Sequence, residues 1–447
     1  MKHKIKKTHI ATADVIDLRD SNERYARTLN KPSNTFNLTE QLPNDVLLHI
    51  FSFLDFKDLT RLAYVCTSWR NLINTSPGLW REMYLKLTCR LHSAQNVRTY
   101  WYASRFGSYL RELIIHCLHH KNNFCKNMAV CVRKMLLNLH ATSLTSLNIF
   151  GVKLFGVSSP IMMSLASILT RFLTRNPCLQ HFKMPLALWR VTAGKKVLNT
   201  VLTVCKGTLE SLMIHGFFLP PKFGQKPADF DQLTNGILSL KNLTKLGIDY
   251  FILNDVFINA LSKSNTKLKR LKMFDMDVRC TVPKVTHNSW RNLTVASPEM
   301  QVAFFGYSVP DVMIAKLDSI LPIYDIRVGV VGFGPRNRTS MSAVLKHITE
   351  NFSGTLVKLQ LDIDTTDRID TAFLRLVRQS KHLIRVTVSA RFTNSKIKKT
   401  VLNVVRERRR RLHLETLPEN TSKRARKTSV NGQGSSTPDA AAPRDGI

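Results

Sequence analysis

A short apolar pattern recurs along most of this chain and sets the fold that it can adopt. The pattern is Leu-x-x-Leu-x-Leu, with other apolar residues allowed, and ten copies begin 25 to 35 residues apart. The copies are Leu110-Leu113-Ile115, Leu144-Leu147-Ile149, Leu179-Phe182-Met184, Leu209-Leu212-Ile214, Leu243-Leu246-Ile248, Leu268-Leu271-Met273, Met300-Val302-Phe304, Ile323-Ile326-Val328, Leu356-Leu359-Leu361 and Leu383-Val386-Val388. Helical apolar spacing fills several gaps between them, over 128–139, 161–173, 196–204, 312–321 and 371–377. A strand and a helix repeated at this period indicate a solenoid, because one unit alone cannot cover its apolar face. The sequence therefore predicts an α/β solenoid of strand-helix units with a curved parallel sheet.

The seventh copy of the pattern has two readings. The letters Trp290-Leu293-Val295 also fit, but they would make the neighbouring steps 22 and 33 residues. The alternation at Met300, Val302 and Phe304, with Met300 in the second position of the pattern, makes the unit begin at residue 297 and the steps 29 and 26. We therefore place the strand there and predict a helix around Trp290.

The strand pattern also predicts which side chains line the opposite, concave face of the sheet. Pattern residues point into the core, and period two sends the alternate residues to the other face. These alternate residues are Ser146, Asn148, His181, Lys183, Met213, His215, Lys245, Arg270, Lys272, Gln301, Arg327, Lys358, Gln360 and Arg385. The candidate binding residues among them are His181, Lys183, Lys245, Arg270, Lys272, Arg327, Lys358 and Arg385. They suggest a substrate-binding surface for an acidic or phosphorylated protein segment, since phosphate pairs with Arg and Lys clusters. The alternative is a merely solvated face, with the target held by loops or by the convex side.

A second feature precedes the repeats, at residues 38–86. Apolar residues at three- and four-residue steps from Leu42 to Leu54 predict one helix, which Pro43 suits as a first-turn residue. Asp58 is expected to cap a second short helix. Three short helices present more apolar side chains than so small a core can bury, so a partner surface is expected.

The residues of this stretch resemble the F-box, the motif by which a receptor subunit docks on the Skp adaptor of a cullin-RING ubiquitin ligase. The matching residues are Leu42-Pro43, Asp45, Val46-Leu47, Ile50, Ser52-Phe53-Leu54, Asp58-Leu59, Leu62-Ala63, Val65-Cys66, Trp69-Arg70 and Trp80. The resemblance implies adaptor-facing positions at Leu42, Pro43, Val46, Leu47, Ile50 and Leu54. It assigns Leu59, Leu62, Val65 and Trp69 to that contact or to internal packing. The alternative is an ordinary helical hairpin that caps the solenoid.

The repeats resemble the leucine-rich-repeat horseshoes found behind many F-boxes. They are degenerate, because the Asn or Cys expected three residues after each strand is absent. Those positions hold Val152, Phe217, Phe251, Met276, Asp364 and Arg391. The segment from Trp101 to Leu110, together with the spacing of the late units, resembles the F-box-only protein thirty-nine group of animals.

Composition indicates an intracellular protein without a cofactor. The net charge is +35, of which +23 lies between residues 38 and 395, so acidic, phosphorylated or nucleic-acid partners are favoured. A lysine-rich surface that serves solubility is an equal alternative. The eight cysteines show no framework spacing, and neither a metal site, a signal peptide nor a membrane span is expected. No catalytic residue set stands out, so we expect no enzyme.

The expected organisation has six parts. They are a flexible leader (1–37), the F-box (38–86), a helical linker (87–109) with helical pattern from Glu82 to Leu91, the solenoid (110–395), a basic C-terminal helix (396–417) and a disordered tail (418–447). A two-part nuclear import signal is suggested by Arg408, Arg409, Arg410, Arg411, Lys423, Arg424, Arg426 and Lys427. The alternative is that the first cluster ends a solvated helix, so the compartment is cytoplasmic, nuclear or both.

Together these features predict a non-catalytic substrate receptor of an SCF-type (Skp-cullin-F-box) ubiquitin ligase. The F-box would bind the Skp adaptor, and through it the cullin-RING complex, while the solenoid would bind the target protein. Two alternatives stay open: a basic scaffold for nucleic acid or chromatin, and an adaptor-bound F-box protein without a degradative role.

Overall fold

The computed structural model describes residues 42–118, 126–219, 230–264, 267–275, 285–329, 340–363, 369–390, 397 and 399–401. The chain divides into two compact units, residues 1–76 and 77–447. The predicted leader, the C-terminal tail, the residues of the predicted import signal and most of the predicted basic helix lie outside the described residues.

The first unit contains three short helices, which we call the N-terminal helical unit. They are α2 (Asn44–Ser52), α3 (Phe56–Leu62) and α4 (Thr67–Thr75). The carboxylate of Asp55 caps α3 by accepting a hydrogen bond from the Asp58 N–H at 2.9 Å. The prediction of Asp58 as the cap was wrong, because the turn after Leu54 is short and α3 begins three residues earlier than expected.

Two contacts tie α4 to the rest of this unit. The ring of Phe51 in α2 meets the ring of Trp69 edge-on, with 5.2 Å between the centroids. The guanidinium Nε of Arg70 donates a hydrogen bond to the Ala63 carbonyl at 2.9 Å, just after α3. These contacts define the interior side of the helices and leave the opposite side of α2 uncovered.

The second unit is a single sheet of eleven strands backed by helices, which we call the repeat unit. The strands are β1 (Glu82–Thr88), β2 (Glu112–Leu118), β3 (Ser146–Phe150), β4 (His181–Lys183), β5 (Ser211–Met213), β6 (Lys245–Asp249), β7 (Arg270–Asp275), β8 (Gln301–Tyr307), β9 (Ile323–Gly329), β10 (Lys358–Ile363) and β11 (Arg385–Ala390). The α-helices are α5 (Ala94–Phe106), α6 (Lys126–Asn138), α7 (Ser159–Thr174), α8 (Val191–Val204), α9 (Asp231–Leu238), α10 (Asp255–Lys263), α11 (His287–Ala296), α12 (Pro310–Lys316), α13 (Met341–Phe352) and α14 (Asp370–Gln379). Three single 3₁₀ turns, η1 (Pro77–Trp80), η2 (Gly107–Tyr109) and η3 (Tyr250–Ile252), complete the described helical segments.

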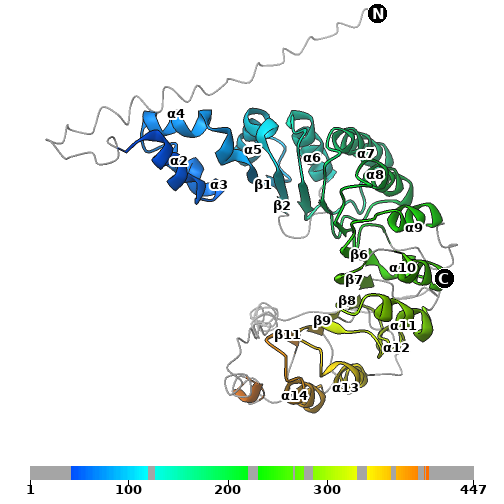
Figure 1. The fold of residues 1–447 in the computed structure, drawn as a ribbon. Helices are drawn as coiled ribbons and strands as arrows, with labels where there is room; N and C mark the ends of the chain where they lie inside the picture. The colour runs from blue at the N-terminus through cyan, green and yellow to red at the C-terminus, as the bar shows by residue number, and fades with distance from the viewer. Residues whose placement is uncertain are drawn as a thin grey trace, which may run out of the picture. The chain divides into compact units, whose positions relative to one another are not determined.

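Strand order in the sheet follows the chain from β1 to β11, and every pair of neighbours is parallel. All ten predicted strands are present, as β2 to β11, and the α/β solenoid fold is confirmed. Figure 1 shows that the strands of the repeat unit follow a curve with the helices on its outer side. No helix of the described residues covers the inner, concave face of the sheet.

One prediction at the start of the repeat unit was wrong. The sequence suggested continued helix from Glu82 to Leu91, but Glu82–Thr88 forms β1 and pairs in register with β2. Burial alternates along β1, with Met83, Leu85 and Leu87 inside, so the period is two and not 3.6. The segment 87–109 therefore belongs to the repeat unit and is not a linker between two parts.

The core of the repeat unit consists of the pattern residues and the inner sides of the helices. Leu147, Leu246 and Leu359 have at most 1% of their surface exposed, as is typical of the other pattern residues. Trp290 is fully buried in α11, which confirms the choice of Met300–Phe304 for the seventh strand. None of the helices in the described residues is long and apolar enough to span a membrane.

A buried asparagine joins two neighbouring repeats. Asn176 is fully buried, and its amide Nδ2 donates hydrogen bonds to the carbonyls of Ala141 and Phe172 at 3.1 and 2.9 Å. Its Oδ1 accepts from the Leu144 N–H at 3.1 Å. The Phe172 carbonyl also accepts from the Arg175 N–H, so the main role of Asn176 is to pair the Leu144 N–H and the Ala141 carbonyl across the two repeats.

Candidate functional site

An exposed apolar row on the N-terminal helical unit is the first candidate surface. Leu42, Val46, Ile50 and Phe53 keep 39%, 39%, 45% and 76% of their surface exposed. They follow one another at steps of four, four and three residues, so they lie along one side of α2 and its two ends. Scattered exposed apolar residues are ordinary, but a continuous row of large ones marks an interaction surface. We call these four residues the α2 apolar row.

The turn between α3 and α4 carries a second pair of exposed apolar side chains. Tyr64 and Val65 retain 69% and 61% of their surface. They follow directly after the end of α3 and precede the Cys66 cap of α4, whose Sγ accepts from the Trp69 N–H at 3.4 Å.

The predicted adaptor-facing residues divide into three groups by burial. Leu42, Pro43, Val46, Ile50 and Val65 are exposed, and Leu54, Leu62 and Trp69 are half-buried. Leu47 and Leu59 have only 5% and 3% of their surface exposed, so they belong to the protein interior and do not present a surface.

Leu47 was predicted to face the adaptor but lies in the interior, for a simple reason. The apolar stripe of α2 is wider than the side that packs, and the sequence does not say which edge of it faces inward. Leu47 and Phe51, one turn apart, turn out to be the buried edge. The predicted adaptor-facing set also left out Phe53 and Tyr64, the two most exposed large apolar residues of the N-terminal helical unit; a ring placed just past a helix end was the available signal.

This stretch has a recognised counterpart among known proteins. Residues 39–86 match the model of the F-box-like family. The chain carries an F-box-like domain. The match covers the α2 apolar row and the exposed turn, and it extends from just before α2 through the first residues of β1.

Two human proteins are similar to the chain over a short part of it. F-box only protein 16 of Homo sapiens is 34% identical over 83 residues, and F-box only protein 48 of Homo sapiens is 38% identical over 63 residues. Each alignment covers 14% of this chain, and 28% and 39% of the respective relative. The F-box-like domain is thus shared with F-box only proteins, whereas the thirty-nine group and the leucine-rich-repeat assignment stay predictions.

A solved structure also overlaps with the chain at low similarity. A protein from Bacteroides fragilis shares 14% sequence identity, over 70% of this chain and 67% of its own, with a TM-score of 0.23.

The concave face of the repeat unit is the second candidate surface. Strand pairing sets Lys245 beside Arg270, and Lys358 beside Arg385, in register across neighbouring strands. Of the predicted substrate-binding residues, Arg270 and Arg385 are exposed. The others are half-buried: His181, Lys183, Lys245, Lys272, Arg327 and Lys358. Burial, as the largest cause, lowers the pKa of His181. The face is therefore basic along most of its length, although three other predicted members, Ser146, Asn148 and His215, are buried.

At the centre of this face two cations stack on one aromatic ring. The Nζ of Lys272 on β7 lies 4.2 Å from the ring centroid of Phe305 on β8. The guanidinium carbon of Arg327 on β9 lies 4.4 Å from the same centroid. Phe305 packs with Phe274 and Ala303 in a small buried cluster, which Tyr307 and Tyr324 flank. We call Lys272, Phe305 and Arg327 the Phe305 clamp.

The charges of the Phe305 clamp are poorly compensated. Burial and the nearby Arg327 lower the pKa of the Lys272 ammonium to about 8. Arg327 meets the Asp325 carboxylate only at 3.5 Å. His215, whose ring lies about 6 Å from those of Phe274 and Phe305, is held neutral, because burial and the same two cations lower its pKa to about 3.

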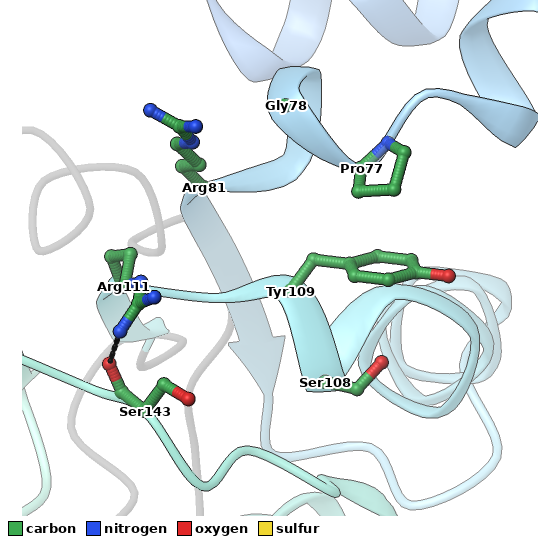
Figure 2. Close-up of a pocket in the computed structure, with 7 residues that line it drawn as sticks. All are labelled: Pro77, Gly78, Arg81, Ser108, Tyr109, Arg111 and Ser143. Carbon is green, nitrogen blue, oxygen red and sulfur yellow. Dashed lines mark hydrogen bonds between the residues drawn. The ribbon is translucent and has the colours of Figure 1, made fainter.

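A shallow pocket lies near the start of the repeat unit. Pro77, Gly78, Arg81, Ser108, Tyr109, Arg111 and Ser143 line about 230 Å³ of open space. Figure 2 shows Arg81 and Arg111 on one side of it, with the Tyr109 ring facing Pro77. Arg111 donates a hydrogen bond to the Ser143 carbonyl at 3.2 Å. The volume is below the roughly 300–1,000 Å³ that is usual for small-molecule sites.

Buried acids elsewhere in the repeat unit serve the fold. Both carboxylate oxygens of Asp275 on β7 accept hydrogen bonds from the Lys316 ammonium at 2.8 Å. Asp249 on β6 accepts from the Gly216 N–H and, at 3.4 Å, from the Phe218 N–H, while burial raises its pKa to about 8. Within the described part of the chain, no group of three or more His, Cys, Asp or Glu could hold a metal ion.

Proposed function

We propose that the protein is the substrate-recognition subunit of an SCF-type ubiquitin ligase. Its F-box-like domain binds the Skp adaptor, and its repeat unit binds a target protein for ubiquitination. The observation that supports this most strongly is the α2 apolar row within a segment that matches the F-box-like family. Four large apolar side chains along one side of a helix fit a hydrophobic groove on a partner.

The energetics of the α2 apolar row favour a permanent partner. Burying an exposed Val, Ile, Leu or Phe fully contributes roughly 1.5–3 kcal/mol, and the four residues keep between 39% and 76% of their surface in water. A few such anchors usually supply most of the binding energy of an interface. Pro43 begins α2, so the backbone of this end is held in its bound form before the adaptor arrives.

The repeat unit supplies a long surface that complements this docking function. Its concave face carries the basic rows and the Phe305 clamp, and a partner with negative charge would be attracted to both. The subunit itself would perform no chemistry. It would hold the target beside a ubiquitin-conjugating enzyme brought by the cullin-RING arm, which raises the effective concentration of the target lysines.

A reconstitution tests the adaptor half of this proposal. The full chain and a chain lacking residues 38–76, which leaves the repeat unit with all of its strands, are each mixed with recombinant Skp adaptor and analysed by size-exclusion chromatography. We expect co-elution only for the full chain. A shortened chain that still co-elutes, while keeping the circular dichroism of the repeat unit, would refute adaptor binding through the F-box-like domain.

A second assay separates a degradative receptor from an adaptor-bound subunit without that role. The full chain is purified from cells with the proteasome blocked, and captured proteins are offered to the assembled ligase with ubiquitin. A receptor is expected to yield chains on at least one captured protein. If none is modified although the adaptor and cullin are present, the non-degradative alternative holds.

The basic concave face also favours a second candidate function, which is nucleic-acid or chromatin binding. Phosphate-backbone binding falls steeply with added salt, whereas specific binding of a protein target depends on salt less strongly. Measuring the capture of duplex DNA and RNA by the full chain at about 50 and 200 mM salt would separate the two, because a loss on the order of 10³-fold is expected only for backbone binding.

A further inference from the structure

We propose that the Phe305 clamp is a phosphate-binding site, which accepts a phosphorylated serine or threonine of a target protein between Lys272 and Arg327. This inference rests on the proposed function, since the target held by the repeat unit supplies the phosphorylated segment. It narrows recognition on the concave face to one position, at the centre of strands β7 to β9.

The sheet register builds the site from three adjacent strands. Phe305 on β8 pairs with Phe274 on β7 and with Arg327 on β9, and Lys272 lies opposite Ala303. Ala303 has no side chain beyond its methyl group, which leaves the Lys272 stem free to reach the Phe305 ring. The shift in register between Val302 and Ala303 changes the pairing of β8 with β9, and beyond it Arg327 lies directly opposite Phe305.

The two cations of the Phe305 clamp share a single nearby carboxylate. Among the described residues, Lys272 makes no ion pair and no side-chain hydrogen bond, and its ammonium contacts the face of Phe305. Arg327 pairs with Asp325 through two long contacts, both at 3.5 Å, and 42% of the Arg327 side chain is exposed. Two positive charges near one ring repel each other, so an anion that pairs with both would relieve a cost already present in the folded protein.

Phosphate fits this arrangement better than a carboxylate does. A phosphorylated side chain carries about −1.5 to −2 charges at pH 7 and three acceptor oxygens, which suffices for two cations on different strands. A carboxylate carries one charge and two acceptor oxygens, so it offers less charge and fewer oxygens to donors that lie on two different strands. Arg327 supplies a planar fork of donors, and Lys272 supplies a point charge on the other strand.

The surroundings of the Phe305 clamp strengthen such a contact. Phe274, Ala303 and Phe305 are at least 94% buried, so the local dielectric constant is lower than at an exposed site. Cation–ring stacking already restricts both long side chains, which reduces the conformational entropy lost on binding.

The neighbouring ionisable groups do not supply a competing anion, apart from Asp325. His215 after β5 is neutral near pH 7. Asp249 at the end of β6 is buried, and its carboxylate accepts hydrogen bonds from the backbone N–H groups of Gly216 and Phe218. Arg270 on β7, Lys245 on β6 and Lys358 on β10 add positive charge to the same face. With a pKa of about 8, the Lys272 ammonium loses its proton as pH rises above that value. Because a bound phosphate favours the charged form of Lys272, phosphate binding should weaken above about pH 8.

The test uses the purified full-length chain and fluorescent peptide pools. Three pools of eleven-residue peptides share randomised flanks and differ at the centre, with phosphoserine, serine, or two glutamates. Fluorescence anisotropy measures binding to the native protein and to three variants: Lys272→Gln, Arg327→Gln and Lys195→Gln. Lys195 on helix α8 is the matched control, because it is a half-buried lysine whose Nζ lies 5.2 Å from the centroid of the Phe230 ring and it is not among the predicted substrate-binding residues.

We expect the phosphoserine pool to bind at least tenfold more tightly than either other pool. Lys272→Gln and Arg327→Gln should each remove most of this preference, and Lys195→Gln should keep it. Equal binding of the glutamate pool would overturn the choice of phosphate in favour of carboxylate. If both clamp variants kept the preference for phosphoserine, the proposed site would be refuted. It would also be refuted if duplex DNA displaced the phosphoserine pool from the Phe305 clamp equally well.

A second measurement on the native protein covers the case in which a variant fails to fold. Limiting acetic anhydride at pH 8 should acetylate Lys272 faster than Lys183, and the phosphoserine pool should protect Lys272 at least fivefold while the serine pool does not. Absence of protection would refute the proposal. Adaptor binding is measured on the same preparation, so that loss of adaptor binding alone bears on the proposed function and loss of phosphopeptide binding alone bears on this site.

Discussion

Two aspartate substitutions in the α2 apolar row should separate adaptor binding from folding. Ile50 and Phe53 keep 45% and 76% of their surface exposed, so a partner can still bury that share of each side chain. Scaling about 1.5–3 kcal/mol per fully buried side chain by these fractions gives about 1 kcal/mol for Ile50 and about 2 kcal/mol for Phe53. The double variant Ile50→Asp/Phe53→Asp therefore loses about 3 kcal/mol of apolar contact, before the cost of burying two carboxylates.

That loss corresponds to a fall in adaptor affinity of at least about 100-fold. Isothermal titration of the full chain with recombinant Skp adaptor measures it directly. The matched control is Val256→Asp in α10 of the repeat unit, where the side chain is 80% exposed and lies outside the F-box-like domain. It makes the same kind of change and should leave the affinity within about threefold.

The same substitutions should barely change stability. Exposed positions usually alter the free energy of unfolding by about 0.5 kcal/mol or less, so urea unfolding of the double variant should resemble that of the native chain. An adaptor affinity that stays within threefold of the native value in the double variant would refute the assignment of this row as the docking surface. Equal weakening by Val256→Asp would show that added negative charge, and not lost apolar contact, is responsible.

Three further predictions concern the buried polar groups of the repeat unit. Lys316→Met removes the ammonium that donates hydrogen bonds to both carboxylate oxygens of Asp275, so the free energy of unfolding in urea should fall by about 3–5 kcal/mol. The control Arg61→Ala breaks an exposed ion pair with Asp58 at 3.0 Å and should lower the free energy of unfolding by less than about 1 kcal/mol. Similar losses in both variants would contradict the reasoning. Asn176→Ala leaves three buried backbone groups without their side-chain partner and should lower the melting temperature, with a loss of about 3 kcal/mol by urea unfolding, and an unchanged midpoint would count against its role. Asp249→Asn should flatten the pH dependence of stability. The folded native chain keeps a proton on Asp249 that the unfolded chain releases above about pH 4, so the free energy of unfolding falls as pH rises from about 4 to about 8. Urea titrations at pH 5, 6.5 and 8 should show a shallower decline in the variant than in the native chain.

Much of the repeat unit was predictable because its signal is periodic. Each pattern copy needs only apolar residues at fixed steps, and the strand begins near its second member, so ten of eleven strands were located. The first strand was missed although Trp80, Met83 and Leu85 fit the pattern 30 residues before Leu110, because this segment was read as a continuation of the helical residues before it. The period of a seven-residue segment is difficult to decide when helix precedes it.

The sites were less predictable because they depend on which side of an element faces solvent. Sequence spacing gathered the α2 residues but could not decide that Leu47 faces inward while Phe53, beyond the end of the helix, stays exposed. On the concave face, alternation placed Lys272 and Arg327 correctly on adjacent parts of one surface. It did not reveal that Phe305 lies between them, because their strands are not consecutive and the register shift at Val302 and Ala303 has no sequence signal.

The parallel strand order, which follows the chain from β1 to β11, has a consequence for how the proposed receptor can change its specificity. Each concave position belongs to a cross-strand row whose members come from different repeats, as in Lys245 and Arg270 or Lys358 and Arg385. Replacing one member alters a single point of the surface and leaves the packing of the adjoining units intact, since the inward residues are separate. A preference for a new target could therefore arise by successive single substitutions along one row, without any change in the proposed adaptor-binding domain.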